Sequence, residues 1–147
     1  RGLGNIKFMN LKLLNKNNLE TNKFYSGDLI KFNFLIENNF NEDTNVQLAI
    51  RIRSSDESYD SMLGNEYLDK VITLKSGSNN ITCELFKIPF SLGKFIINII
   101  LKKNQITEDF IQDITYFEIL GGGYLMDTYV YPESFKGIYL DHDWYES

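Results

Sequence analysis

Several stretches of the sequence alternate apolar residues with side chains that donate hydrogen bonds or offer a flat ring. Lys31 and Asn33 alternate with Phe32 and Phe34, and arginines alternate with isoleucines over residues 50–53. Planar polar groups on a rigid surface bind paired hydroxyls, and an aromatic ring stacks on the C–H face of a sugar. The pattern therefore predicts a sugar-binding sheet face, with an ordinary solvent-facing surface as the alternative. The residues predicted to contact the ligand are Lys31, Asn33, Arg51, Arg53, Tyr59, Tyr67 and Tyr116.

Nucleotide-binding motifs are not matched by the glycine-containing segments. Gly93-Lys94 is followed by Phe95, and Ile88 stands where a phosphate-binding loop needs its first glycine. The triplet 121–123 follows a predicted strand but opens no helix, so a dinucleotide fingerprint also fails. We interpret the triplet as a hinge and expect no cofactor in this fragment.

Two acidic clusters raise the question of metal binding. Asp56, Glu57, Asp60 and Glu66 share one polar stretch, but their spacing does not match a helix-loop-helix calcium site. The triplet 141–143 contains the single histidine, without a cysteine to complete a typical site. Solvated segments are the default interpretation of both clusters, with calcium in the acidic stretch as the weaker alternative. We predict no metal site and no catalytic residues.

Composition restricts the class of protein. The chain has 147 residues, the size of one domain, with a net charge of -5 and a sequence pI near 4.9, which argues against nucleic-acid binding. Its one cysteine, Cys83, excludes an intrachain disulfide and is predicted to be a buried thiol. The start shows no signal-peptide pattern and no initiator methionine, so we expect a piece of a longer protein.

Period-two alternation, with a single alanine at position 49, predicts an all-β chain. We expect polar loops over residues 54–67 and 104–109, and an antiparallel β-sandwich, jelly-roll or immunoglobulin-like, of about seven to eight strands in a single domain over residues 1–147. The predicted strands span residues 6–14, 29–37, 46–53, 71–74, 81–88, 94–101 and 115–119.

The C-terminal segment, residues 120–147, differs from the rest of the chain. Tyrosines, one phenylalanine and the only tryptophan stand there among acidic residues, without the composition of a flexible linker. Such an aromatic tail should be packed, either on its own domain or on a partner chain.

The order of short motifs resembles a known family. Phe24-Tyr25-Ser26-Gly27-Asp28 precedes a long alternating strand, and residues 48–53 precede a polar loop. Further matches are residues 4–8, 88–95, 116–119 and the ending 137–144, a glycine, a short apolar stretch and a tryptophan. Together they resemble the C-terminal carbohydrate-binding domain of Wzt-type ATPase subunits of O-antigen and polysaccharide-exporting ABC transporters.

This resemblance implies a jelly-roll domain that binds the exported glycan, often at its modified non-reducing end, and passes it to the membrane channel subunit. It implies a role in lipopolysaccharide biosynthesis and a cytoplasmic location at the inner face of the membrane. It also implies a homodimer that can exchange the C-terminal strand. ATP hydrolysis would belong to a preceding domain, so the fragment itself is expected not to be an enzyme. The acidic stretch lacks the Asp-Gly turn of relatives.

Two other functions are compatible with the residues. The first alternative is a β-sandwich interaction or assembly module that acts through its aromatic C-terminal tail. The second is a small carbohydrate-active enzyme, which would need two carboxylates flanking a glycosidic bond.

Overall fold

Ten strands and one short 3-10 helix make up the part of the chain that the computed structural model describes, residues 4–90, 92–120 and 142–147. The prediction of an all-β chain is confirmed, although short strands raise the number above the seven or eight expected. The elements are β1 Ile6–Leu14, β2 Lys23–Tyr25, β3 Ile30–Asn38, β4 Thr44–Ser54, β5 Asp60–Gly64, η1 Asn65–Leu68, β6 Ile72–Leu74, β7 Gly77–Leu85, β8 Gly93–Lys103, β9 Ile106–Leu120 and β10 His142–Glu146.

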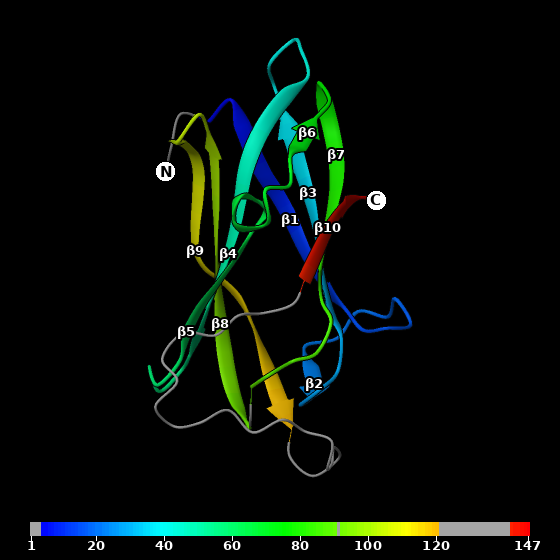
Figure 1. The fold of residues 1–147 in the computed structure, drawn as a ribbon, viewed down its shortest axis with the longest axis vertical. Helices are drawn as coiled ribbons and strands as arrows, with labels where there is room; N and C mark the ends of the chain where they lie inside the picture. Colours follow the sequence, from blue (N-terminus) through cyan, green and yellow to red (C-terminus); the bar gives the residue numbers. More distant parts are fainter. Residues whose placement is uncertain (1–3, 91, 121–141) are drawn as a thin grey trace.

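Two sheets pack face to face as a β-sandwich (Figure 1). The four-stranded sheet has the order β1-β3-β7-β10, and its neighbouring strands are antiparallel. The six-stranded sheet has the order β2-β9-β8-β4-β5, with β6 paired to β4 beside β5. Within it β2 runs parallel to β9. Each sheet buries one face against the other, which is why apolar and polar residues alternate along the strands.

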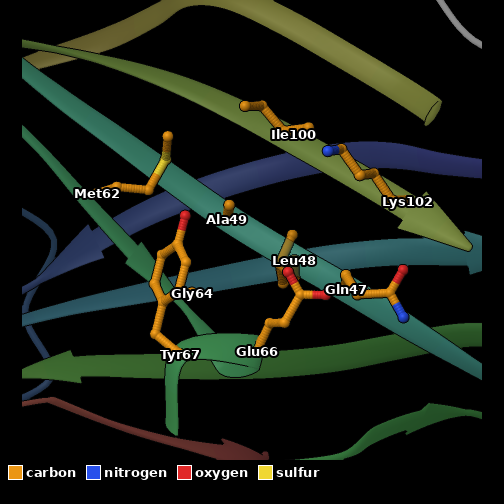
Figure 2. Close-up of a pocket in the computed structure, with 9 residues that line it drawn as sticks. All are labelled: Gln47, Leu48, Ala49, Met62, Gly64, Glu66, Tyr67, Ile100 and Lys102. Carbon is orange, nitrogen blue, oxygen red and sulfur yellow. The ribbon is translucent and has the colours of Figure 1, made fainter. Parts of the chain in front are cut away.

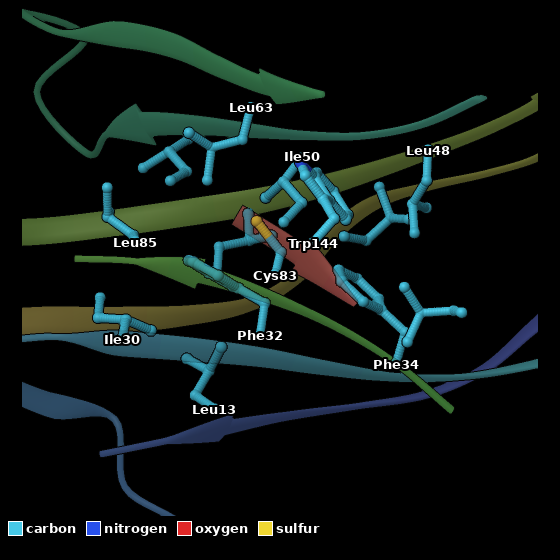
Figure 3. Close-up of a cluster of buried hydrophobic side chains, with 14 of the residues drawn as sticks. Leu13, Ile30, Phe32, Phe34, Leu48, Ile50, Leu63, Cys83, Leu85 and Trp144 are labelled. Carbon is cyan, nitrogen blue, oxygen red and sulfur yellow. The ribbon is translucent and has the colours of Figure 1, made fainter. Parts of the chain in front are cut away.

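The core consists of the inward residues of both sheets (Figure 3). Phe32 and Phe34 of β3 face Leu48 and Ile50 of β4, and all four side chains are buried. Cys83 is fully buried as predicted, and its burial raises the pKa of the thiol well above the usual range. The thiol is therefore an apolar filler of the core.

One end of the sandwich is closed by a column of aromatic rings. Phe95 stacks on Phe90 at 4.5 Å between ring centroids and on Phe117 at 5.4 Å. Phe24 of the short strand β2 adds an edge contact to Phe117 at 6.2 Å. The predicted strands did not include β2, because three residues are too few to show a period of two.

The stretch 54–67 is not the loop that we expected. Residues 60–64 form β5, with Ser61 and Leu63 buried and Asp60 and Met62 exposed, and η1 follows directly. A tight turn precedes β5, where the Asp56 carboxylate accepts hydrogen bonds from the Ser54 hydroxyl at 2.7 Å and the Ser58 amide at 3.0 Å. The short strand was not predicted because it directly follows a polar turn and has too few residues to show a clear period.

Strand β9 starts at Ile106, nine residues before the predicted start, so the expected loop at 104–109 shrinks to a two-residue turn. Its alternation is broken in two places. Glu108 and Asp109 are both buried, and Asp113 has a φ of 51° next to a shift in the pairing with β8. Such β-bulges reverse the inward and outward positions and destroy the sequence period.

The end of the C-terminal segment is packed on its own chain. β10 pairs antiparallel with β7, and Trp144 is fully buried and stacks on Phe34 at 6.3 Å between centroids. Figure 1 shows this red strand beside β7 at the edge of the four-stranded sheet. The predicted hinge 121–123 and the tail residues up to 141 lie outside the described residues. Exchange of the strand in a dimer stays a prediction.

Among the described residues, no helix is long and apolar enough to cross a membrane.

Candidate functional site

The seven predicted contact residues do not share one face. Lys31 and Asn33 belong to β3 of the four-stranded sheet, whereas Arg51 and Arg53 belong to β4 of the six-stranded sheet. Their side chains point outward from opposite sides of the sandwich. The expectation that these four residues act on one preformed face is therefore wrong. Period-two alternation identifies an outward residue but not the sheet to which its strand belongs.

On the outer face of the four-stranded sheet, Lys31 and Asn33 already form hydrogen bonds with other side chains of the same chain. The Lys31 ammonium donates to the Asn18 side-chain oxygen at 2.8 Å and lies 3.9 Å from Glu84. Asn33 donates to the hydroxyls of Thr82 at 3.0 Å and Ser147 at 3.1 Å. A ligand on this face would have to compete with these hydrogen bonds.

Arg51 on the six-stranded sheet is paired with a carboxylate. Its Nε and Nη2 donate to the two oxygens of Asp60 at 2.9 and 2.6 Å, a bidentate pair between neighbouring strands. The hydrogen bond from Arg51 holds the pKa of Asp60 below its usual range, and the same bond raises the pKa of Arg51. Asp60 is therefore ionised at neutral pH and unsuited to act as a general acid.

Arg53 is paired as well, through the bulge in β9. Its Nη2 contacts the carboxylate of Asp113 in an ion pair. Asn98, buried between them, accepts a hydrogen bond from the Asp113 amide at 2.8 Å and fixes the bulge. The two arginines and their partners, Asp60 and Asp113, form a strip of paired charges across β5, β4, β8 and β9, which we call the arginine strip.

The three predicted tyrosines differ in their access to solvent. The Lys94 ammonium lies 4.2 Å from the ring centroid of Tyr116 and covers one of its faces. Tyr59 packs 6.5 Å from the buried ring of Phe90 and helps to close the end of the core. Tyr67 in η1 is the most open, with 61% of its surface exposed. Of the three, Tyr67 best fits a stacking platform.

Tyr67 lies against the backbone of Gly64, on the outer face of the six-stranded sheet (Figure 2). A Cβ atom at Gly64 would stand 3.1 Å from Cε2 of the ring, which is tighter than ordinary contact. Gly64 has extended backbone angles, so the missing side chain matters here for space and not for conformation. The ring can lie close to the sheet because residue 64 is a glycine.

A cross-strand row of apolar residues continues from this platform. Pairing places Ala49 beside both Gly64 and Ile100, and Ile100 beside Phe110. We call these four residues, Gly64, Ala49, Ile100 and Phe110, the apolar row. The row is low over β5 and β4, where glycine and alanine stand, and Ile100 of β8 rises beside them. The exposed rings of Tyr67 and Phe110 stand at its two ends.

Polar side chains border the apolar row. On one side Gln47 pairs with Lys102, and the Gln47 side-chain oxygen accepts the Gln105 amide at 3.2 Å. Gln105 in turn donates to the Glu66 carboxylate at 2.6 Å. On the other side lies the arginine strip. Tyr67, Met62, Gln47, Glu66 and Lys102 are among the residues that line a shallow hollow of about 80 Å³. Figure 2 shows how these side chains lie on the outer face of the sheet.

Asn65 positions the 3-10 helix that carries Tyr67. Its side-chain oxygen accepts the Leu48 amide at 2.8 Å, and its nitrogen donates to the carbonyls of Val46 at 3.2 Å and Lys70 at 2.8 Å. These contacts fill the gap on β4 between its pairing with β6, which ends at Val46, and its pairing with β5, which starts at Ala49. The Asn65 side chain thus makes the hydrogen bonds to β4 that a neighbouring strand would otherwise make.

Sequence reasoning missed most of the apolar row. Ala49 alternates with the core residues of its strand but has no polar chemistry to single it out. Ile100 lies in a strand that is apolar on both faces, which predicts burial on both sides, and Gly64 and Phe110 lay in or beside predicted loops. The available signal was the pair of small residues, Gly64 and the only alanine, close to exposed tyrosines. It becomes readable once the pairing of β4 with β5 is known.

The described residues contain no cluster typical of a metal site: no group of three or more His, Cys, Asp or Glu side chains there could hold a metal ion. Hydrogen bonds from Ser58 lower the pKa of Asp56 to about 2, and the hydrogen bond from Lys70 lowers the pKa of Asp143. The general acid of a glycosidase needs a raised pKa, so the direction of these two shifts does not suit Asp56 or Asp143 to that role.

Comparison with solved structures identifies the fold. Over 84% of this chain and 78% of the other, the structure superimposes on the crystal structure of the C-terminal domain of Wzt with a TM-score of 0.69 and 12% sequence identity. The chain has the fold of the Wzt C-terminal domain. No protein-family model matches the sequence, and a search of curated proteins gives no match.

Parts of larger proteins share this sandwich. A Bacteroides uniformis β-glucuronidase aligns with a TM-score of 0.58 and 14% identity over 78% of this chain, which corresponds to 14% of the glucuronidase. The alkylpurine DNA glycosylase AlkC of Pseudomonas fluorescens, bound to DNA, aligns at 0.56 and 13% over 80% of this chain and 31% of its own. Function on such a fold therefore has to be argued from the surface.

Proposed function

We propose that this chain is a non-catalytic carbohydrate-binding domain that recognises an O-antigen-like cell-surface polysaccharide. The glycan lies on the outer face of the six-stranded sheet. One observation carries the proposal: an exposed tyrosine ring, Tyr67, lies over a glycine at the end of an apolar row that is bordered by amide, carboxylate and ammonium groups. The ring and the row suit the C–H face of a sugar, and the polar borders suit its hydroxyls.

The biological context of the proposal comes from the fold and from the resemblance in sequence. In it, the chain is the C-terminal domain of the ATP-binding subunit of a polysaccharide-exporting ABC transporter, located in the cytoplasm at the inner face of the membrane. Glycan binding would couple to export through the membrane channel subunit. ATP hydrolysis would take place in another domain, and the carbohydrate-binding face needs no cofactor.

The shallow site predicts weak binding by each domain. Its hollow is well below the roughly 300–1,000 Å³ of pockets that enclose a ligand, so much of a bound sugar stays hydrated. A homodimer would present two such faces to one long polymer and gain avidity.

The proposal is tested by screening the purified chain against a bacterial polysaccharide array and titrating the strongest binder by calorimetry. We expect saturable binding that falls about threefold to tenfold in Tyr67→Ala, the factor that an aromatic stacking contact corresponds to. Tyr145→Ala is the matched control, because Tyr145 is an exposed tyrosine on the outer face of the opposite sheet. No binding to any polysaccharide would refute the proposal and favour an interaction module instead.

A further inference from the structure

A crevice opens along one edge of the sandwich, between β1 of the four-stranded sheet and β9 of the six-stranded sheet. The two strands do not pair with each other, and β2 covers β9 only over residues 118–120. The crevice has a volume of about 320 Å³, against about 80 Å³ for the hollow beside Tyr67. It thus reaches the lower limit, roughly 300 Å³, of pockets that enclose a ligand. The residues that line it are Leu11, Leu13, Glu20, Thr21, Asn22 and Thr115.

Hydrogen bonds between the two sheets fix both ends of the crevice. At one end, the Phe8 amide donates to the buried carboxylate of Asp109 at 3.0 Å and ties β1 to β9. At the other end, residues 20–22 cross from one sheet to the other. The Thr21 amide donates to a β1 carbonyl at 3.0 Å, and the Asn22 carbonyl accepts a β9 amide at 2.7 Å. The walls are therefore held in place by the fold and do not have to rearrange around a ligand.

Polar side chains without a partner in the described part of the chain line the crevice. They are the Glu20 carboxylate, the Asn22 side-chain amide and the Thr115 hydroxyl. Pairing with Ile97 places Thr115 on the inner face of β9, the face on which Phe117 is buried in the core. Polar groups that face inward normally have a hydrogen-bond partner, so the Thr115 hydroxyl is available to a ligand. The Thr21 hydroxyl differs, because it accepts the Lys23 amide at 3.1 Å.

The lining determines the chemistry of a ligand that would fit. Leu11 and Leu13 form an apolar floor at the margin of the core. A carboxylate, an amide and a hydroxyl on this floor suit a ring with C–H groups on its face and hydroxyls on its edge. One side chain of the lining is acidic and none is basic, so an anionic ligand would be repelled. The volume suits one such ring.

From these observations we infer that the crevice between β1 and β9 is a second carbohydrate site, which binds a single neutral or amine-bearing hexose. It is separate from the apolar row, because Leu13 and Thr115 face the inside of the sandwich and the row lies on the outer face of the six-stranded sheet. The inference goes beyond the proposed function and does not depend on it. A free sugar and one residue of a polysaccharide offer the same ring chemistry to this site.

The test is an NMR titration of the 15N-labelled chain with free hexoses. Glucose, galactose and mannose are each used as the neutral sugar, the amino sugar and the uronic acid, so that ring and charge vary separately. We expect saturable shifts in the amide signals of Thr21, Asn22 and Thr115 with a neutral or amino form, and about fivefold weaker binding of the matching uronic acid. The signals of Ala49 and Tyr67 report the apolar row separately.

Thr115→Val distinguishes a ligand contact from a structural role. It replaces the hydroxyl with a methyl group, so hexose binding should fall about threefold to tenfold, the factor for one hydrogen bond. The melting temperature should not fall, because this hydroxyl has no partner in the part of the chain that the structure describes. Thr107→Val is the matched control, since Thr107 is a half-buried threonine of the same strand outside the crevice.

Glu20→Gln tests the origin of the charge preference. The substitution keeps the size and the hydrogen-bonding capacity of the side chain but removes its charge. The affinity for the uronic acid should then come within about twofold of that for the neutral sugar, because the repulsion is lost. An unchanged penalty on the uronic acid would show that Glu20 does not contact the ligand, which overturns the site.

The remaining outcomes decide the site and the source of its ligand. Crevice signals that shift with the polysaccharide from the array as well identify the hexose as part of the glycan, and shifts with free hexoses alone identify a free sugar. No shift at the crevice with any hexose, up to its solubility limit, leaves water as the only occupant and overturns the inference. Equal losses of affinity in Thr115→Val and Thr107→Val also overturn it. The proposed function is tested separately, by Tyr67→Ala and polysaccharide binding.

Discussion

The ring of Tyr67 lies so close to Gly64 that a Cβ atom at residue 64 would stand 3.1 Å from its Cε2 atom. The two residues are three positions apart, at the junction of β5 and the 3-10 helix. This contact turns a flexible exposed side chain into a platform that is held against the sheet. A held ring loses little side-chain entropy when a ligand stacks on it, which favours binding.

Gly64→Val should therefore weaken glycan binding without removing any ligand contact. The added methyl groups push the ring off the sheet, and we expect a loss of affinity similar to that of Tyr67→Ala, about threefold to tenfold. The extended backbone at residue 64 accepts valine, so the melting temperature should change little. Calorimetric titration and thermal unfolding check both points, and full affinity in this variant would contradict the role of the contact.

Asn65→Ala should destabilise the domain by about 2–4 kcal/mol, because the Leu48 amide and the carbonyls of Val46 and Lys70 lose their hydrogen-bond partner. The Leu48 and Val46 groups belong to a buried part of β4, where water cannot replace the lost partner. Urea unfolding measures the change. Asn45→Ala is the control, since Asn45 is on the same strand but exposed, and it should cost less than about 1 kcal/mol. Equal losses in the two variants would show that the hydrogen bonds from the Asn65 side chain to β4 do not contribute to the free energy of unfolding.

Much of the fold can be predicted from the sequence, because a period of two is a local property. β1, β3 and β4 were predicted within two residues at each end, and the burial of Cys83 followed from its neighbours Ile81 and Leu85. β5 and the first half of β9 were missed for different reasons. β5 is short and follows a polar turn, and β9 contains bulges that shift its period.

Trp144 links the end of the chain to the core. Trp144→Ala removes a fully buried ring that stacks on Phe34, and it should cost about 3–5 kcal/mol in the free energy of unfolding. Urea unfolding has to be followed by circular dichroism, because the substitution removes the only tryptophan. Tyr145→Ala, the outward neighbour, should cost much less. A loss below about 1 kcal/mol in Trp144→Ala would mean that β10 is not part of the stable core.

Acid should destabilise the turn before β5. Hydrogen bonds from Ser58 and Ser54 lower the pKa of Asp56 from 3.8 to about 2 in the folded chain. A lowered folded-state pKa stabilises the fold above pH 3.8, and this contribution is lost as the pH falls from 3.8 to about 2. Asp56→Asn should reduce the slope of melting temperature against pH in that window, and Ser58→Ala should do the same. If the slope in both variants equals that of the unmodified chain, the lowered pKa of Asp56 is not the cause of the acid sensitivity.

The site was less predictable than the fold because it depends on strand pairing. Arg51 and Lys31 look alike in sequence, each an outward cation on an alternating strand, yet they lie on opposite faces of the sandwich. The arginines were predicted as ligand contacts, and the structure pairs each with a carboxylate, Asp60 or Asp113, that is 9 or 60 residues away in the chain. Those partners, and the neighbours of Ala49 across the sheet, are fixed by register alone.

The most direct test of carbohydrate binding at the six-stranded sheet is to map the contact by NMR. The 15N-labelled chain is titrated with the polysaccharide that the array selects, and shifts in the amide signals are followed. We predict that the largest shifts fall on the apolar row and Tyr67, with the amides of Lys31 and Asn33 unchanged. Shifts confined to the four-stranded sheet, or no shifts with any polysaccharide, would contradict the account.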